Sequence, residues 1–93
     1  MGRKELFDKV AYGVRLRVLR KKRGYRRGKD FCSDVKEQTG LDIDINVLYR
    51  IERGEQAPTV DQILAFNFVL KTEVFKGMAK YASYCPYCGE KVV

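Results

Sequence analysis

The stretch DINVLYRIERGEQAP, residues 44–58, has the pattern of one short helix with a defined start and a defined end. Asp44 is a good N-cap, because its carboxylate can accept hydrogen bonds from the first backbone amides of a helix. Gly54 favours a helix C-terminus, and the proline four residues later cannot continue a helix. A narrow apolar stripe is available for burial: Leu48 and Ile51. We therefore predict a helix over residues 45–53.

Capping and spacing signals predict further helices on both sides of this one. Thr59 and Gln62 form a capping-box pattern at the start of another helix. Gly24 and Gly40 mark the ends of two more, at about residues 23 and 38. The expected helices cover residues 5–23, 29–38, 45–53, 60–70 and 73–81. No strand alternation of useful length occurs, so the predicted fold is all-α, a compact domain of four to five helices.

The first expected helix carries apolar residues at three- and four-residue spacing, which predicts the face that it turns to the core. These residues are Leu6, Val10, Val14, Phe7 and Ala11, continued with a slight shift of face by Leu16 and Leu19. The second expected helix should bury Phe31, Cys32 and Val35. The basic residues that crowd the end of the first helix suit the negative end of its dipole.

Positive charge is concentrated at one end of the 93-residue chain, which is long enough for one domain. The first 30 residues carry 12 Lys or Arg and 3 acidic residues, a net charge of +9, whereas residues 31–93 carry −2. Such a lobe is typical of a protein that binds a phosphate backbone, although charge alone equally describes a solvated face. No apolar run is long enough to span a membrane, and no apolar signal core follows the N-terminus, so we expect a cytoplasmic protein.

Between about residues 12 and 70 the sequence resembles the Cro/repressor (XRE-type) helix-turn-helix family. Three stretches carry the resemblance. YGVRLRVLR, residues 12–20, followed by Gly24, is similar to the family's first helix. LYRIERG, residues 48–54, followed by Pro58, is similar to its third helix and exit turn. The fourth helix is matched by Val60, Ile63, Leu64 and Leu70.

The resemblance implies that helix 45–53 enters the major groove of double-stranded DNA while the preceding helix crosses the backbone. The residues then expected at base edges are Ile45, Asn46, Val47, Tyr49 and Arg50, with a core contact as the alternative for Ile45. The residues expected at phosphates are Arg26, Arg27 and Lys29. Arg20 and Glu52 match the family's paired arginine and glutamate, which tie the first helix to the third.

The chain departs from the family pattern in two places. The Leu-Ala pair of the second helix corresponds to Phe31-Cys32, which leaves about six extra residues before Leu48 and a longer turn. This alignment makes Cys32 a small core residue rather than a ligand or a nucleophile. Asn67 is polar where the fourth helix of the family is usually small and apolar.

The C-terminal CPYCG, residues 85–89, resembles a zinc knuckle, because two thiolates with two residues between them can chelate one metal. A redox dithiol needs a sheet fold with a helix after the first cysteine, and neither is predicted here. Cys85 and Cys88 supply two of the four ligands of a structural zinc, so the simplest site is one zinc shared between two chains. The alternative is a metal-free tail with free or disulfide-bonded thiols.

These observations predict a DNA-binding domain over residues 1–82, followed by a knuckle-like tail over 83–93. We expect a homodimeric transcriptional regulator, a repressor by occupancy, at the nucleoid and without a membrane or small-molecule substrate. No catalytic histidine, carboxylate pair or phosphate-cradling loop is evident, which argues against an enzyme. The alternative is a protein-interaction module in which the knuckle, Phe68 and Ala65 form the docking surface.

Overall fold

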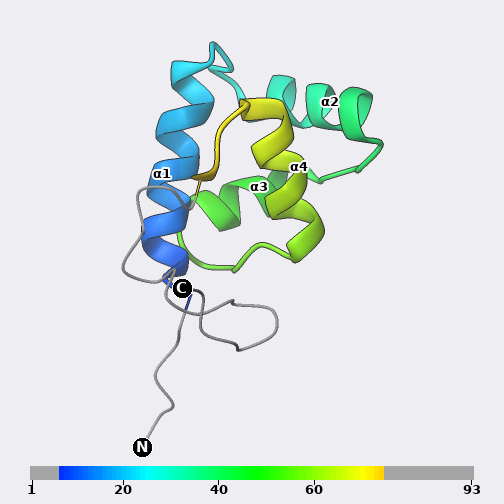
Figure 1. The fold of residues 1–93 in the computed structure, drawn as a ribbon. Helices are drawn as coiled ribbons and strands as arrows, with labels where there is room; N and C mark the ends of the chain where they lie inside the picture. The colour runs from blue at the N-terminus through cyan, green and yellow to red at the C-terminus, as the bar shows by residue number, and fades with distance from the viewer. Residues whose placement is uncertain (1–6, 75–93) are drawn as a thin grey trace, which may run out of the picture.

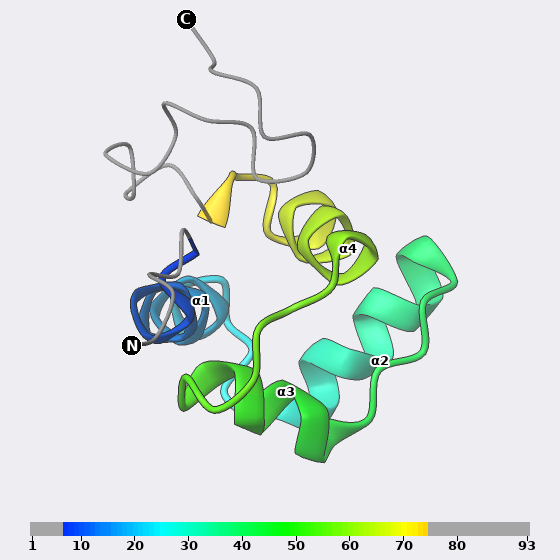
Figure 2. The same cartoon turned by 90° about the horizontal axis from the view of Figure 1, so that it is seen from below.

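A computed structural model describes residues 7–74, which form four α-helices: α1 (Lys9–Lys22), α2 (Gly28–Thr39), α3 (Ile45–Glu52) and α4 (Val60–Leu70). No strand occurs within this range, so the all-α prediction is confirmed. α1 packs against α3, and α2 packs against both α3 and α4 (Figures 1 and 2). None of these helices is long and apolar enough to cross a membrane.

The expected fifth helix lies almost entirely beyond the described part of the chain. Glu73 is not helical, and residues 75–81 fall outside the description. The tail over 83–93, which contains Cys85 and Cys88, also falls outside it.

α1 begins four residues later than predicted, at Lys9 instead of residue 5. Asp8 is the N-cap, and its side chain accepts a hydrogen bond from the backbone amide of Ala11 at 3.0 Å. A capping carboxylate satisfies an amide that has no partner inside the helix, and it also sits at the positive end of the helix dipole. Phe7, just before the cap, packs on Tyr12 with ring centroids 5.4 Å apart.

The prediction for the buried face of α1 was wrong in part. Its buried residues are Tyr12, Gly13, Leu16 and Arg20. Val10 and Val14, which were expected in the core, are exposed together with Val18 and form a stripe on the outer side of the helix. The side of α1 that faces α3 carries Gly13, and the glycine allows the backbones of α1 and α3 to approach closely.

Gly13 marks this close approach. A Cβ atom at residue 13 would lie within 2.6 Å of the carbonyl oxygen of Glu52 and would also collide with the carbonyl oxygen of Ile51. Both obstacles are backbone atoms of α3, so they cannot rotate away as a side chain would. The spacing of α1 and α3 therefore depends on the absence of a side chain at this position.

The bounds of the other three helices lie within one residue of the predicted ones, because their caps are encoded locally. The Asp44 carboxylate accepts from the amide of Asn46 at 2.7 Å, and Thr59 and Gln62 form the complete capping box. Gly40 and Gly54 end α2 and α3 with φ of +81° and +77°. These are left-handed conformations that glycine adopts with little strain.

The core lies where α2 and α4 face α1 and α3. The fully buried rings of Phe31 and Phe66 stack at its centre with centroids 5.5 Å apart, and the partly buried Tyr25 packs on Phe31 at 5.2 Å. Val74, the last residue that the structure describes, is buried and completes the core. Its amide donates to the Asn67 side chain at 3.0 Å, and its carbonyl oxygen accepts from Arg15 Nε at 2.8 Å. The polar side chain of Asn67 thus fixes the chain after α4 against α1.

Replacing Gly13 by Ala is expected to destabilise the protein by at least about 1–3 kcal/mol, the usual cost of overpacking. Ala in place of Gly normally stabilises a helix interior by about 1 kcal/mol, so the predicted sign is reversed. Chemical unfolding monitored by circular dichroism measures the change. Gly24→Ala is the control, because Gly24 has φ +95° but no atom within 4 Å, so only backbone strain is added. Equal or higher stability of Gly13→Ala would contradict the close approach.

Candidate nucleic-acid interface

α3 presents a polar stripe to solvent. Asn46 and Arg50 are exposed and four residues apart, and exposed Arg53 follows three residues later at the C-cap. Residues at this spacing lie above one another on one side of a helix. The opposite side is buried in the core through Leu48 and Ile51. Two of the five expected base-reading residues, Asn46 and Arg50, are thus placed on an open surface.

The other three expected base-reading residues are half-buried. Val47 packs against the core cluster, and Ile45 is neither fully buried nor exposed. The hydroxyl of Tyr49 accepts a hydrogen bond from the backbone amide of Gly28 at 3.2 Å. Tyr49 therefore links α3 to the first turn of α2 and is engaged within the domain.

Arg26, Arg27 and Lys29 are all exposed around the first turn of α2. Arg27 is the N-cap residue of α2 and provides no side-chain capping hydrogen bond. Its guanidinium lies 3.4 Å from the Asp30 carboxylate, an exposed pair of little energetic weight. Three cations therefore surround the positive end of the α2 dipole, an arrangement that favours an anion.

A polar cavity of about 410 Å³ lies beside the C-terminal end of α3. Its lining comes from α1, the turn before α2, and α3: Arg17, Arg20, Lys21, Arg26, Tyr49, Glu52 and Arg53. Arg20 and Glu52 neutralise each other within its wall. Arg17, Lys21 and Arg26 have no salt-bridge partner among the described residues, whereas Arg53 pairs with Glu55 at 2.6 Å. The cavity therefore carries an excess of positive charge.

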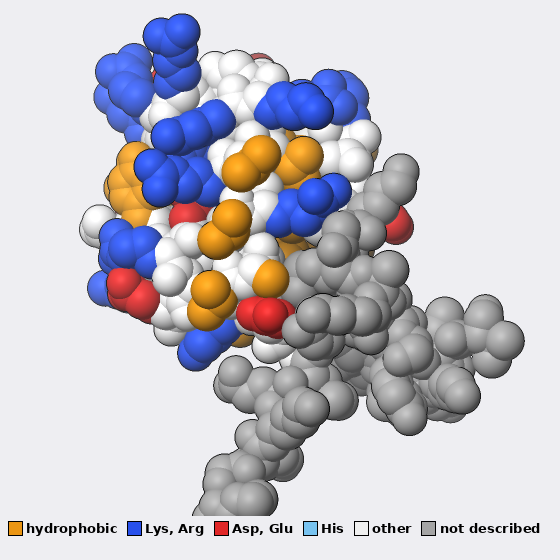
Figure 3. Space-filling model, turned by 90° about the vertical axis from the view of Figure 1, so that its left-hand side faces the viewer, with side chains coloured by type: hydrophobic (Ala, Val, Ile, Leu, Met, Phe, Trp, Pro, Cys, Tyr) orange, Lys and Arg blue, Asp and Glu red, His pale blue; other side chains and the backbone are white. Residues whose placement is uncertain are grey.

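Figure 3 views the outer side of α1, where Lys and Arg side chains outnumber acidic ones. Hydrophobic side chains lie between them, in keeping with the exposed valines of α1. Residues 7–30, the described part of the basic N-terminal third, carry 10 Lys or Arg and 2 acidic residues, a net charge of +8, and they contribute to this basic surface.

Arg17, Lys21 and Arg53 were not among the residues predicted to contact DNA. A signal for the first two was present in the sequence, because positions four apart on a helix share one side. The basic residues of α1 were counted in the positive lobe and as partners of the helix dipole, but none of them was assigned individually to DNA. Arg53 reaches the cavity because α3 ends there, which depends on the packing of α3 against α1.

The expected ion pair between Arg20 and Glu52 is formed. Arg20 Nε lies 2.6 Å from Glu52 Oε2, and Nη2 lies 3.1 Å from Oε1, a two-pronged contact. Both side chains are nearly inaccessible, at 3% and 5% exposure. The remaining guanidinium nitrogen, Nη1, donates to the carbonyl oxygens of Tyr25 and Arg26 at 2.6 and 3.0 Å. One arginine thereby joins α1, α3 and the basic turn.

The same turn is fastened to α2 by Tyr25, whose hydroxyl donates to the carboxylate of Asp34. This hydrogen bond, with some burial, raises the pKa of Tyr25 to about 12, and it holds the pKa of Asp34 below its ordinary value. At neutral pH the Tyr25 hydroxyl stays protonated and the Asp34 carboxylate stays ionised, so this hydrogen bond does not change with pH in that range.

Cys32 packs against the core from α2, as expected, and is half-buried. Burial, followed by the nearby Glu52 carboxylate, raises the pKa of its thiol to about 11. A thiol with this pKa is protonated at neutral pH and is a poor nucleophile. Residues 7–74 hold no cluster of three or more His, Cys, Asp or Glu side chains placed for a metal ion.

Comparisons of the chain with protein-family models, with curated proteins and with solved structures gave no match. The function is therefore inferred from the geometry and charge of the site.

Removing either member of the Arg20–Glu52 pair is expected to cost about 3–5 kcal/mol of unfolding free energy, because the partner is left charged in the interior. A double-mutant cycle with Arg20→Ala and Glu52→Ala should give a coupling well above about 0.5 kcal/mol. Arg20→Lys should recover little of the stability lost in Arg20→Ala, since an ammonium cannot make the two-pronged contact.

The exposed pair Arg53–Glu55 is the matched control, with the same 2.6 Å distance between Nε and Oε2 but side chains 58% and 55% exposed. Solvent screens such a pair, so its cycle should show little coupling. Additive effects at Arg20 and Glu52 would show that their contact contributes nothing to stability.

Proposed function

We propose that this protein is a sequence-specific DNA-binding regulator that inserts α3 into the major groove and acts as a homodimer by occupying its site. The observation that carries the proposal is the placement of the basic cavity at the end of the exposed polar stripe of α3. A base-reading surface and a phosphate-binding surface would thus lie side by side.

Asn46 and Arg50 are the residues proposed to read bases. An amide can hydrogen-bond adenine through two atoms, and a guanidinium can do the same with guanine. Both side chains extend from α3, a rigid helix whose inner side is fixed by Leu48 and Ile51. Fixed geometry matters here, because discrimination between bases depends on the angle at which the donors approach.

Two groups of cations are proposed to bind the phosphates on either side. Arg26, Arg27 and Lys29 surround the start of α2, and Arg17, Lys21 and Arg53 line the cavity at the end of α3. The buried Arg20 fixes the turn that carries Arg26 through its bonds to two carbonyl oxygens. Contacts of this kind set the register of the protein on the duplex without reading its sequence.

DNA binding should therefore depend strongly on salt. A dimer that contacts about 6–10 phosphates should lose roughly 10³–10⁵ in affinity between 50 and 200 mM salt. Selection from random duplexes, followed by titration by fluorescence anisotropy, tests this. Asn46→Ala and Arg50→Ala should each cost about 1–3 kcal/mol on the selected site and relax preference at one or two base pairs. If no duplex in the pool is bound, or if both variants select the unchanged site, the proposal is wrong.

Lys21→Gln should weaken binding to every duplex alike and reduce the salt dependence, since it removes a phosphate contact. Lys22→Gln is a close control. It removes the same charge from the adjacent residue, but Lys22 lies with Leu19, Arg23 and Thr72 on another side of α1. Equal loss of affinity in the two variants would indicate a general effect of net charge and would exclude a specific role for the cavity.

A further inference from the structure

α4 has an apolar outer side as well as an apolar inner side. Its inner side is buried through Ile63, Phe66 and Leu70. Its outer side exposes three apolar residues at four-residue spacing: Val60, Leu64 and Phe68. Leu64 and Phe68 are 59% and 62% exposed. We call these three residues the α4 stripe.

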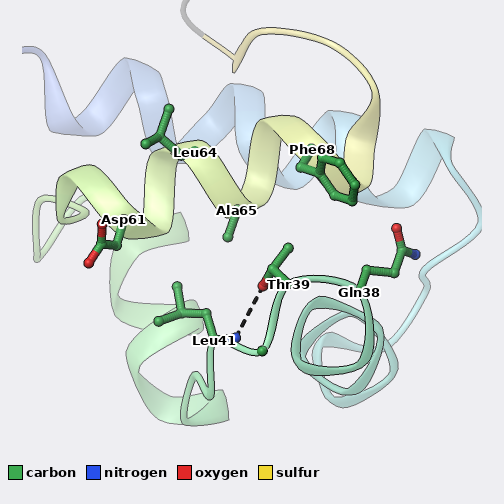
Figure 4. A pocket seen from close by; sticks show the side chains of 8 residues that line it. Gln38, Thr39, Leu41, Asp61, Leu64, Ala65 and Phe68 are labelled. Atoms are coloured by element: carbon green, nitrogen blue, oxygen red, sulfur yellow. Dashed lines mark hydrogen bonds between the residues drawn. The ribbon is translucent and has the colours of Figure 1, made fainter.

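A groove of about 460 Å³ runs beside the α4 stripe. Leu64, Ala65 and Phe68 form one wall, and residues 38–41, at the end of α2, form the other. Figure 4 shows Leu41 and Thr39 facing α4 across the groove, with Ala65 between Leu64 and Phe68. Of the two residues named above for a docking surface, Phe68 is exposed, whereas Ala65 is buried at the base of this groove.

The charge around the α4 stripe distinguishes it from the other exposed apolar stripe, Val10, Val14 and Val18 on α1. Among residues 7–74, Asp61 is the one charged residue that lines the groove. The α1 stripe shares its helix with exposed Arg17, Lys21 and Lys22. Two chains of net charge +7 repel each other most where their basic surfaces meet. Of these two stripes, the α4 stripe is the one on which two copies can meet without opposing basic helices, since α4 itself contains no Lys or Arg.

We infer that the α4 stripe and its groove form the surface on which a second copy of this chain docks. The stripe is self-complementary about a two-fold axis at Leu64. With two α4 helices antiparallel, each Leu64 enters the partner's groove, and the small Val60 lies opposite the partner's large Phe68. The same patch is then used on both copies, as two-fold symmetry requires.

This inference deepens the proposed function, which expects a homodimer, but the association needs no DNA. α4 lies away from α3 in the view of Figure 2. Asn46 and Arg50 belong to α3 and take no part in the groove. Dimerisation and DNA binding therefore depend on separate residues and can fail independently.

The first test is sedimentation equilibrium without DNA, over a concentration series and with chelator present so that no bound metal bridges two chains. The wild-type chain should dimerise reversibly. Leu64→Asp should raise the dimer dissociation constant at least about 30-fold, as expected for a central interface residue. Val14→Asp is the matched control, because Val14 is 58% exposed on the other apolar stripe. It should leave the dissociation constant unchanged, and both variants should keep the wild-type circular dichroism spectrum.

The second test starts from a chain without its own cysteines, made by Cys32→Ala, Cys85→Ser and Cys88→Ser. In this chain Leu64→Cys adds one cysteine, which should form a disulfide with the same residue of the second copy under mild oxidation. Val14→Cys in the same chain should not. A wild-type monomer at every concentration would overturn the inference. So would a dimer that resists Leu64→Asp but dissociates on chelation or with Val14→Asp. A monomer that still selects a DNA site would refute the homodimer but leave sequence-specific DNA binding standing, whereas a dimer that binds no DNA would refute DNA binding alone.

Discussion

Arg20 and Glu52 bring two opposite charges into the interior, and desolvating them requires that every polar atom of the guanidinium find a partner. Two nitrogens meet Glu52, and the third meets the carbonyl oxygens of Tyr25 and Arg26. These acceptors belong to α3 and to the turn before α2. The cost of burying the two charges is offset only when α1, α3 and that turn are all in their native positions. The three segments are therefore expected to adopt this arrangement together.

Gly13 supplies the second constraint on the same interface. It lies seven residues before Arg20 on α1, and its missing side chain allows the backbone of Ile51 and Glu52 to come close. Helix α1 is thus fixed to α3 at two points two turns apart, once by a close backbone approach and once by an ion pair. The basic cavity is a consequence, because its walls are the segments that this interface positions.

The limits of α2, α3 and α4 were predictable because a cap is a local event. Asp44, Thr59 and the glycines after α2 and α3 act on amides and carbonyls a few residues away. The inner face of α1 was less predictable, because the sequence offers two competing stripes. Val10, Val14 and Val18 have the same four-residue spacing as Tyr12, Leu16 and Arg20. Hydrophobicity favours the valine stripe as the buried one, because the second stripe contains an arginine. Arg20 can be buried in the second stripe because it pairs with Glu52, which lies 32 residues further along the chain.

The candidate site shows the same division between local and long-range information. Exposure of Asn46 and Arg50 follows from helical spacing once the buried positions of α3 are known. The hydrogen bond from the Gly28 amide to the hydroxyl of Tyr49 joins residues 21 positions apart, and no local sequence pattern predicts it. The cavity is harder still to predict, because three separate segments must come together before Arg17, Lys21 and Arg53 share one space.

The state of Cys32 bears on the metal expected at Cys85 and Cys88. A zinc thiolate requires that the ligand lose its proton, and burial on α2 raises the pKa of the Cys32 thiol to about 11. Recruiting Cys32 would also withdraw a side chain that packs against the core. The described residues place no other cysteine, and the chain contains no histidine. A four-thiolate zinc site built on Cys85 and Cys88 would need two further thiolates, and because the chain has three cysteines, Cys32 could supply only one of them. Such a site would therefore require a second chain. That requirement is independent of the α4 stripe, so metal and apolar surface would be separate contributions to one assembly.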